Sequence, residues 1–181
     1  MEEAQRRIDE WVSLNNTTQI LDLSHLELTE LPLLPSNVEV LWCYHNQLTE
    51  LPSLPSSLEI LNCSHNQLTE FSLLPQGLYY LYCYYNQLTK LPNLPQSLKG
   101  LLINHNQLTE LPSLPSSLEV LGCRYNRLTK LPLLPGSLKW IGRDDNPIQY
   151  PSPEVMERPI KEIREWMSEN PLNFVKSAAK K

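Results

Sequence analysis

The chain has 181 residues, with 15 lysines and arginines against 20 aspartates and glutamates, which gives a net charge of −5. This balance disfavours nucleic acid as a partner, because the chain lacks a dense basic surface for phosphates. No apolar run approaches the roughly 18 residues that a membrane-spanning helix needs, so we do not expect membrane insertion. The N-terminus is charged where a secretory signal would be apolar, which predicts a cytoplasmic protein.

Residues 1–16 are predicted to form an N-terminal capping helix. Apolar residues recur there at the spacing of one helix face, namely Ala4, Ile8, Trp11 and Val12. The charged residues between them can face water, and the Asn15-Asn16 pair is expected to end the helix. Such a helix would cover the open end of an elongated repeat fold.

Residues 17–151 repeat one 20-residue unit, written LEILNCSHNQLTELPSLPSS from Leu58 onward. A fixed period of this length is typical of a solenoid, in which each rung buries its apolar residues by stacking on its neighbours. The alignment gives six full rungs and a partial seventh. We therefore predict an α/β repeat solenoid that forms one structural domain together with its two end caps.

Each rung is predicted to contain one short parallel strand and an extended return. The LxC segment forms the strand on the concave face, and the asparagine three residues after the cysteine points inward to satisfy backbone groups. Two prolines per rung, such as Pro52 and Pro55, favour a polyproline-like convex side with no room for a helix.

The pattern LxxLxCxxNxLTxLPxLPxx resembles that of leucine-rich repeats, and its LPxLP return is similar to the short bacterial class of YopM-like and IpaH-like effectors. The resemblance implies a protein-binding solenoid. Relatives that are ubiquitin ligases carry a catalytic domain after the repeats, whereas only about 30 residues without a cysteine follow Pro151 here. No GxSxG, HExxH or glycine-rich phosphate loop is present either, so we predict neither enzymatic activity nor a cofactor.

The concave face, formed by residues that alternate with the core, is the predicted binding surface. Its fourth rung is entirely tyrosine, and Gly100, Gly122 and Gly142 lie beyond it, which predicts a depression floored by glycine backbone. Aromatic residues and arginine are enriched at binding hot spots. The predicted protein-binding residues are Trp42, Tyr44, Tyr80, Tyr82, Tyr84, Tyr85, Arg124, Tyr125 and Trp140. The alternative is that the tyrosines only stack on their neighbours along the ladder.

Two further columns contain residue types that often bind metals. The cysteines Cys43, Cys63, Cys83 and Cys123 all occupy one core position, so we interpret them as small buried apolar side chains kept reduced. The histidines His25, His45, His65 and His105 all precede the asparagine position or its equivalent. We expect each histidine ring to lie over its neighbour rather than to bind a metal; a metal site or joint protonation near pH 6 is the alternative.

Charge is distributed unevenly along the solenoid. Nine acidic residues and no basic residue lie between Ile8 and Thr89, whereas seven basic and four acidic residues lie between Lys90 and Asp145. In the second half the signs alternate between rungs, which predicts weakly stabilising ion pairs.

Residues 152–181 are predicted to form a C-terminal helical cap and a basic tail. Ser152 can cap a helix that starts at Pro153, with an apolar stripe at Val155, Ile160, Ile163 and Met167. Pro159 should split this helix into a short piece and a main piece over residues 159–168. Arg143 takes the core position of the last rung, which predicts an irregular final strand with a pairing to Asp144 or Asp145.

Together these features predict a non-enzymatic scaffold, effector-like in class, that binds an unidentified protein partner on its concave face. It would act in the cytoplasm, or in the host cytoplasm if it is a secreted effector or a viral protein. The alternative is a structural repeat protein that self-associates through its sides and edges.

Overall fold

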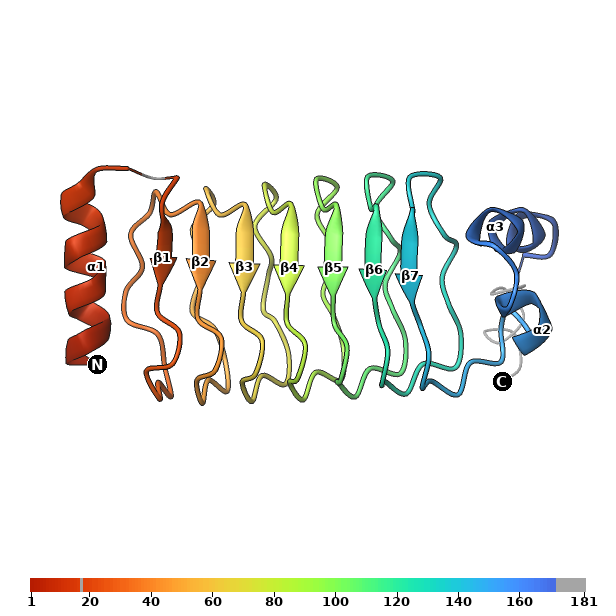
Figure 1. Ribbon diagram of the computed structural model, residues 1–181, viewed down its shortest axis with the longest axis horizontal. Coiled ribbons are helices and arrows are strands. Elements are labelled where there is room, and N and C mark those ends of the chain that lie inside the picture. Colours follow the sequence, from red (N-terminus) through yellow and green to blue (C-terminus); the bar gives the residue numbers. More distant parts are fainter. Residues whose placement is uncertain (17, 172–181) are drawn as a thin grey trace, which may run out of the picture.

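The computed structural model describes residues 1–16 and 18–171, and it forms a row of rungs with helices at both ends (Figure 1). The elements in chain order are α1 (Glu2–Leu14), β1 (Ile20–Asp22), β2 (Val40–Trp42), β3 (Ile60–Asn62), β4 (Tyr80–Tyr82), β5 (Gly100–Leu102), β6 (Val120–Gly122), β7 (Trp140–Gly142), α2 (Pro153–Met156) and α3 (Ile160–Glu169). We number each rung by its strand.

The seven strands form one parallel sheet in sequence order, from β1 to β7. Each residue pairs with the residue 20 positions later, as Leu41 pairs with Leu61, so equivalent residues of successive rungs form straight columns. The middle residue of every strand is buried, and no helix interrupts the described chain between β1 and β7. The predicted repeat solenoid is confirmed.

The asparagine column connects the rungs from inside. Asn86 is typical: its Oδ1 accepts the Leu68 N–H at 3.0 Å, and its Nδ2 donates to the carbonyls of Cys63 at 3.1 Å and Cys83 at 3.2 Å. One side chain thus satisfies three backbone groups that the tight turn leaves unpaired. The same arrangement is found at Asn46, Asn66, Asn106, Asn126 and Asn146.

The four cysteines are buried free thiols in the core, as predicted. Burial raises the pKa of Cys43 and of Cys63 well above the ordinary value, and it raises the pKa of Cys123 to about 12. The thiols of Cys43, Cys63 and Cys123 therefore stay protonated near neutral pH, and all four buried cysteines serve as packing groups.

Helix α1 covers the open edge of β1. Ala4, Ile8 and Trp11 are buried against the first rung, but Val12 is 53% exposed, so its assignment to the buried stripe was wrong. Trp11 Nε1 donates to the Gln19 carbonyl at 2.9 Å, and Arg7 Nη1 donates to the Asp22 carbonyl at 3.0 Å. The Arg7 bond replaces the donor that a preceding rung supplies to the same carbonyl in later rungs, as the Leu23 N–H donates to the Trp42 carbonyl.

The C-terminal cap is two short helices, as the position of Pro159 predicts. Pro159 is the N-cap of α3, and Val155, Ile163 and Met167 are buried. The predicted basic tail lies outside the described residues.

The last strand differs from its prediction. β7 pairs with β6 in regular register, with Ile141 opposite Leu121. Arg143 donates to the Met156 carbonyl in α2 rather than pairing with a neighbouring aspartate. The strand stays regular because the long side chain carries its charge out of the core toward the cap.

Candidate protein-binding surface

Alternation along the strands places the side chains of the concave face. In β4, Leu81 is buried, whereas Tyr80 and Tyr82 on either side of it point outward, and Tyr84 follows two residues later. The same three positions of every rung form the concave face, because successive side chains of a strand point to opposite sides.

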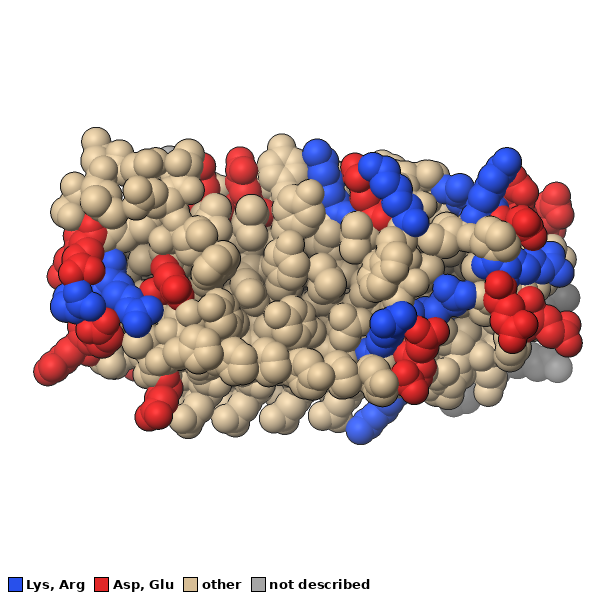
Figure 2. All heavy atoms as spheres, in the orientation of Figure 1, with Lys and Arg blue, Asp and Glu red and all other residues tan. Residues whose placement is uncertain are grey.

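The middle of this face carries no charged side chain. Its positions in rungs 2 to 5 are Val40, Trp42, Tyr44, Ile60, Asn62, Ser64, Tyr80, Tyr82, Tyr84, Gly100, Leu102 and Asn104. Figure 2 shows a central band without charged side chains, which lie toward both ends of the molecule and along its upper edge. A partner's charge buried in this strip would find no counter-charge, so the strip suits a neutral, apolar or aromatic surface.

Two aromatic groups lie on the strip. Tyr80 and Tyr82 are nearly parallel, with ring centroids 6.4 Å apart, and Trp42 and Tyr44 form a second group with centroids 6.0 Å apart. Burial, with smaller contributions from Tyr80 and Tyr84, raises the pKa of Tyr82. Its phenol therefore remains a neutral hydrogen-bond donor near pH 7.

The prediction of a depression over the glycines was wrong, because aromatic rings cover two of these glycines. A Cβ on Gly100 would lie 2.6 Å from Cδ1 of Tyr80, and a Cβ on Gly142 would lie 2.6 Å from Cη2 of Trp140. The Tyr80 ring therefore leans over Gly100 of the next rung, and the Trp140 ring leans over Gly142 of its own rung. Each ring fills the space above its glycine. The glycines make room for these rings rather than leaving a hollow.

A shallow hollow of about 290 Å³ instead lies closer to the turns that follow β4, β5 and β6. Its lining residues are Tyr84, Tyr85, Leu102, Asn104, His105, Arg124 and Tyr125. Four predicted residues thus meet at one site. The predicted site did not include Leu102, Asn104 and His105. Their place in the rung that follows the tyrosine rung is the signal that could have indicated them.

Arg124 is held in place at the rim of this hollow. Its Nε lies 2.9 Å from Asp144 Oδ2, its guanidinium lies 5.8 Å from the Trp140 ring centroid, and its backbone N–H donates to Asn104 Oδ1 at 2.9 Å. Trp140 therefore packs beyond the hollow and supports Arg124. Trp42 and Tyr44 lie two rungs before β4, apart from the hollow.

A column of six stacked rings borders the concave face. His25, His45, His65, Tyr85, His105 and Tyr125 have successive ring centroids 4.0–4.7 Å apart. All six residues have a left-handed backbone conformation, with φ between 52° and 57°. Such backbone is costly for residues other than glycine, and stacking offsets part of that cost. The prediction that each ring lies over its neighbour is confirmed.

The stacked geometry does not suit a metal ion. A histidine bonds a metal in its own ring plane at about 2.0–2.1 Å, and near-parallel stacked rings with centroids 4.1 Å and 4.7 Å apart do not direct their nitrogens at one ion in this way. Within residues 1–16 and 18–171, no group of three histidine, cysteine or acidic side chains is arranged to hold a metal. No helix in that same part of the chain is long and apolar enough to cross a membrane.

Comparisons with known proteins identify the class of repeat. A family model described as "Leucine Rich repeats (2 copies)" matches residues 36–76. YopM from Yersinia enterocolitica WA-314 is similar at 40% identity and a TM-score of 0.77, over 80% of this chain and 32% of that chain. A Shigella effector LRR domain is similar at 36% identity and a TM-score of 0.79, over 86% of this chain and 70% of that chain.

YopM from Yersinia pestis is also similar, at 39% identity and a TM-score of 0.77, over 82% of this chain and 42% of that chain. This chain therefore spans less than half the length of either YopM protein. A search of curated protein sequences finds no match. The repeat fold and these effector relatives support a protein-interaction scaffold. The chain belongs to the leucine-rich repeat proteins of the short YopM-like and IpaH-like class.

Proposed function

We propose that this chain is a non-enzymatic scaffold that binds a protein partner on its concave face, with the hollow beside Tyr84 and Arg124 as the anchor point. The uncharged strip of rungs 2 to 5 carries the proposal, because it exposes tyrosine and tryptophan with a polar rim. Hot spots of protein interfaces combine these features.

The partner segment most compatible with this surface is neutral and carries an apolar or aromatic side chain that enters the hollow. Its own charges would lie outside the strip, toward Asp22 at one end or the Arg124–Asp144 ion pair at the other. Because the similar Shigella domain is described as part of an effector, we propose a host protein as partner and the host cytoplasm as the place of action. Nucleic acid and membrane are not part of the proposal.

The test is capture from a lysate of cultured eukaryotic cells on the immobilised chain. We expect the Tyr82→Ala, Tyr84→Ala, Arg124→Ala triple variant to lose proteins that the wild type retains. Tyr79→Ala is the matched control, because Tyr79 is 38% exposed but lies in the column of Glu59 and Lys99, off the concave face.

Retention of every wild-type partner by the triple variant would refute the proposal. Equal losses from the triple variant and from Tyr79→Ala would also refute it. A thermal melt of each variant shows whether the fold is intact, since none of the four residues belongs to the buried core.

A further inference from the structure

The return side of the solenoid carries a column of charges that is acidic in the first three rungs and alternates in sign in the next three. The column consists of Glu30, Glu50, Glu70, Lys90, Glu110 and Lys130. Glu70 and Lys90 form an ion pair at 2.6 Å, and Glu110 and Lys130 form a longer one at 3.9 Å. No lysine or arginine lies between Ile8 and Thr89, so the column is acidic through its first three rungs, and Glu70 pairs with Lys90 of the next rung.

A second column, three residues further along each rung, contains exposed leucines. Leu33 is 92% exposed, Leu73 is 80% exposed and Leu133 is 62% exposed. The remaining rungs place Ser53, Asn93 and Ser113 at this position. The repeat therefore tolerates small polar residues here, and the three leucines are not required for packing within the rung.

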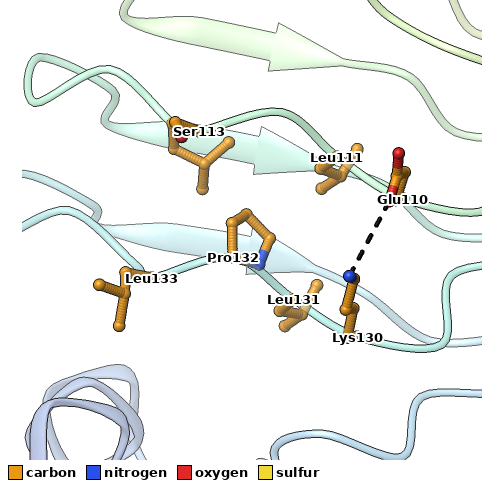
Figure 3. A pocket seen from close by; sticks show the side chains of 8 residues that line it. Glu110, Leu111, Ser113, Lys130, Leu131, Pro132 and Leu133 are labelled. Atoms are coloured by element: carbon orange, nitrogen blue, oxygen red, sulfur yellow. Dashed lines mark ion pairs between the residues drawn. The ribbon is translucent and has the colours of Figure 1, made fainter. Parts of the chain in front are cut away.

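An apolar groove of about 430 Å³ opens on the same side, between the returns of rungs 5 and 6. Leu111, Leu114, Leu131, Pro132 and Leu133 line it, and Figure 3 shows the Glu110–Lys130 ion pair at one end. The return of rung 6 is hydrogen-bonded both to the last partial rung and to the C-terminal cap. The Leu131 N–H donates to the Tyr150 carbonyl at 3.0 Å, and Arg164 Nη1 donates to the Pro135 carbonyl at 3.0 Å.

We propose that a second copy of this chain docks antiparallel on this return face, which comprises residues 30–34 and their equivalents in rungs 2 to 6. A two-fold axis between rungs 3 and 4, parallel to the returns, places rung 1 of one copy on rung 6 of the other. Leu33 then faces the groove beside Leu133. The same register places Glu30 opposite Lys130 and Glu70 opposite Lys90.

One register thus brings the exposed leucines to the groove and places Glu30 opposite Lys130 and Glu70 opposite Lys90, although the two columns are independent features of the sequence. Glu50 meets Glu110 in this register, and this like-charge contact weakens the interface, because Lys130 faces both Glu110 of its own chain and Glu30 of the other copy. The interface is small and its charges are exposed, so the dimer is weak and loosens as salt rises. Both concave faces point outward and remain free, so the dimer could engage two partner sites.

Sedimentation velocity of the wild type, Glu30→Lys and Lys130→Glu tests the register. We expect the wild type to dimerise with a dissociation constant below about 200 µM, so that its sedimentation coefficient rises with protein concentration. Each charge reversal should weaken dimerisation at least tenfold. An equimolar mixture of the two variants should restore it, because each Glu30→Lys copy then meets a Lys130→Glu copy and every opposite-charge contact returns.

Leu33→Ser tests the apolar contact and should weaken the dimer, since serine already occupies this column at Ser53 and Ser113 without harm to the rung. Leu14→Ser in α1 is the matched control, because Leu14 is 58% exposed and lies away from the return face. A wild type that stays monomeric would overturn the proposal. A dimer that ignores these substitutions, or a variant mixture that stays monomeric, would also overturn it.

Discussion

Single buried polar side chains hold the rungs of this solenoid together. The asparagine column is the clearest case, because each amide hydrogen-bonds backbone groups of its own rung and of the preceding one. A polar group buried in this way stabilises the fold only while its partners are satisfied. These asparagine side chains therefore help to keep neighbouring rungs in register.

Asn86→Ala should lower the free energy of unfolding by about 1–3 kcal/mol, because the Leu68 N–H and two carbonyls lose their buried partner. Urea denaturation followed by circular dichroism measures the change. Asn93→Ala is the control and should leave stability within about 0.5 kcal/mol of the wild type, since Asn93 is exposed on the return face.

Two serines at the same concave position should respond in opposite directions. Ser64 Oγ is buried with no hydrogen-bond partner among the described residues, whereas Ser24 Oγ donates to Asp22 Oδ1. Ser64→Ala should therefore raise the free energy of unfolding by about 1 kcal/mol, and Ser24→Ala should lower it by a similar amount. Equal losses in both variants would show that Ser64 is satisfied after all.

At the scale of secondary-structure elements, the terminal helices stabilise the solenoid by covering its open ends. α1 covers the first rung with three buried side chains and two hydrogen bonds to the edge of β1. Trp11→Ala should lower the free energy of unfolding by about 3 kcal/mol, because a buried indole and its hydrogen bond to Gln19 are lost together. Val12→Ala is the matched control in the same helix and should be close to neutral.

The ring column makes the stability of the solenoid depend on pH. Desolvation, with the charges of His45 and His105, lowers the pKa of His65 below its usual 6.5. The unfolded chain therefore binds a proton at a higher pH than the folded chain does. The stability that the neutral ring contributes is present above about pH 6.5 and is lost as the pH falls below it.

His65→Tyr keeps a ring in the column, as Tyr85 and Tyr125 do naturally, but removes the titrating group. We expect its urea midpoint to fall less than that of the wild type between about pH 7.5 and pH 5.5. An identical decrease in both proteins would show that His65 does not carry the effect.

The rungs could be predicted from the sequence because a 20-residue period leaves one register that buries Leu41, Cys43 and Asn46 together. The stacked His/Tyr column could also be predicted, but the packing of the large concave side chains could not. The ring of Tyr80 leans over Gly100, and Trp140 covers Gly142, so the predicted depression is filled and the hollow lies nearer the turns. The direction in which a large side chain leans depends on its neighbours, and the repeat pattern does not encode it.

At the scale of the whole molecule, the two long faces have different characters. The concave face is neutral and aromatic in its middle rungs, whereas the return face carries leucines and a column of charges that is acidic up to Glu70 and alternates in sign from Lys90 onward. The proposed partner and the proposed second copy therefore use opposite sides of one rigid stack. Binding at one face leaves the other face accessible.

Photo-crosslinking in a cell lysate tests the central claim most directly. A benzophenone amino acid replaces Tyr82 on the concave face in one variant and Val12, which is 53% exposed on α1, in another. The account predicts that position 82 forms a covalent adduct with another protein and that position 12 does not. Adducts from position 12 alone, or the same adducts from both positions, would contradict it.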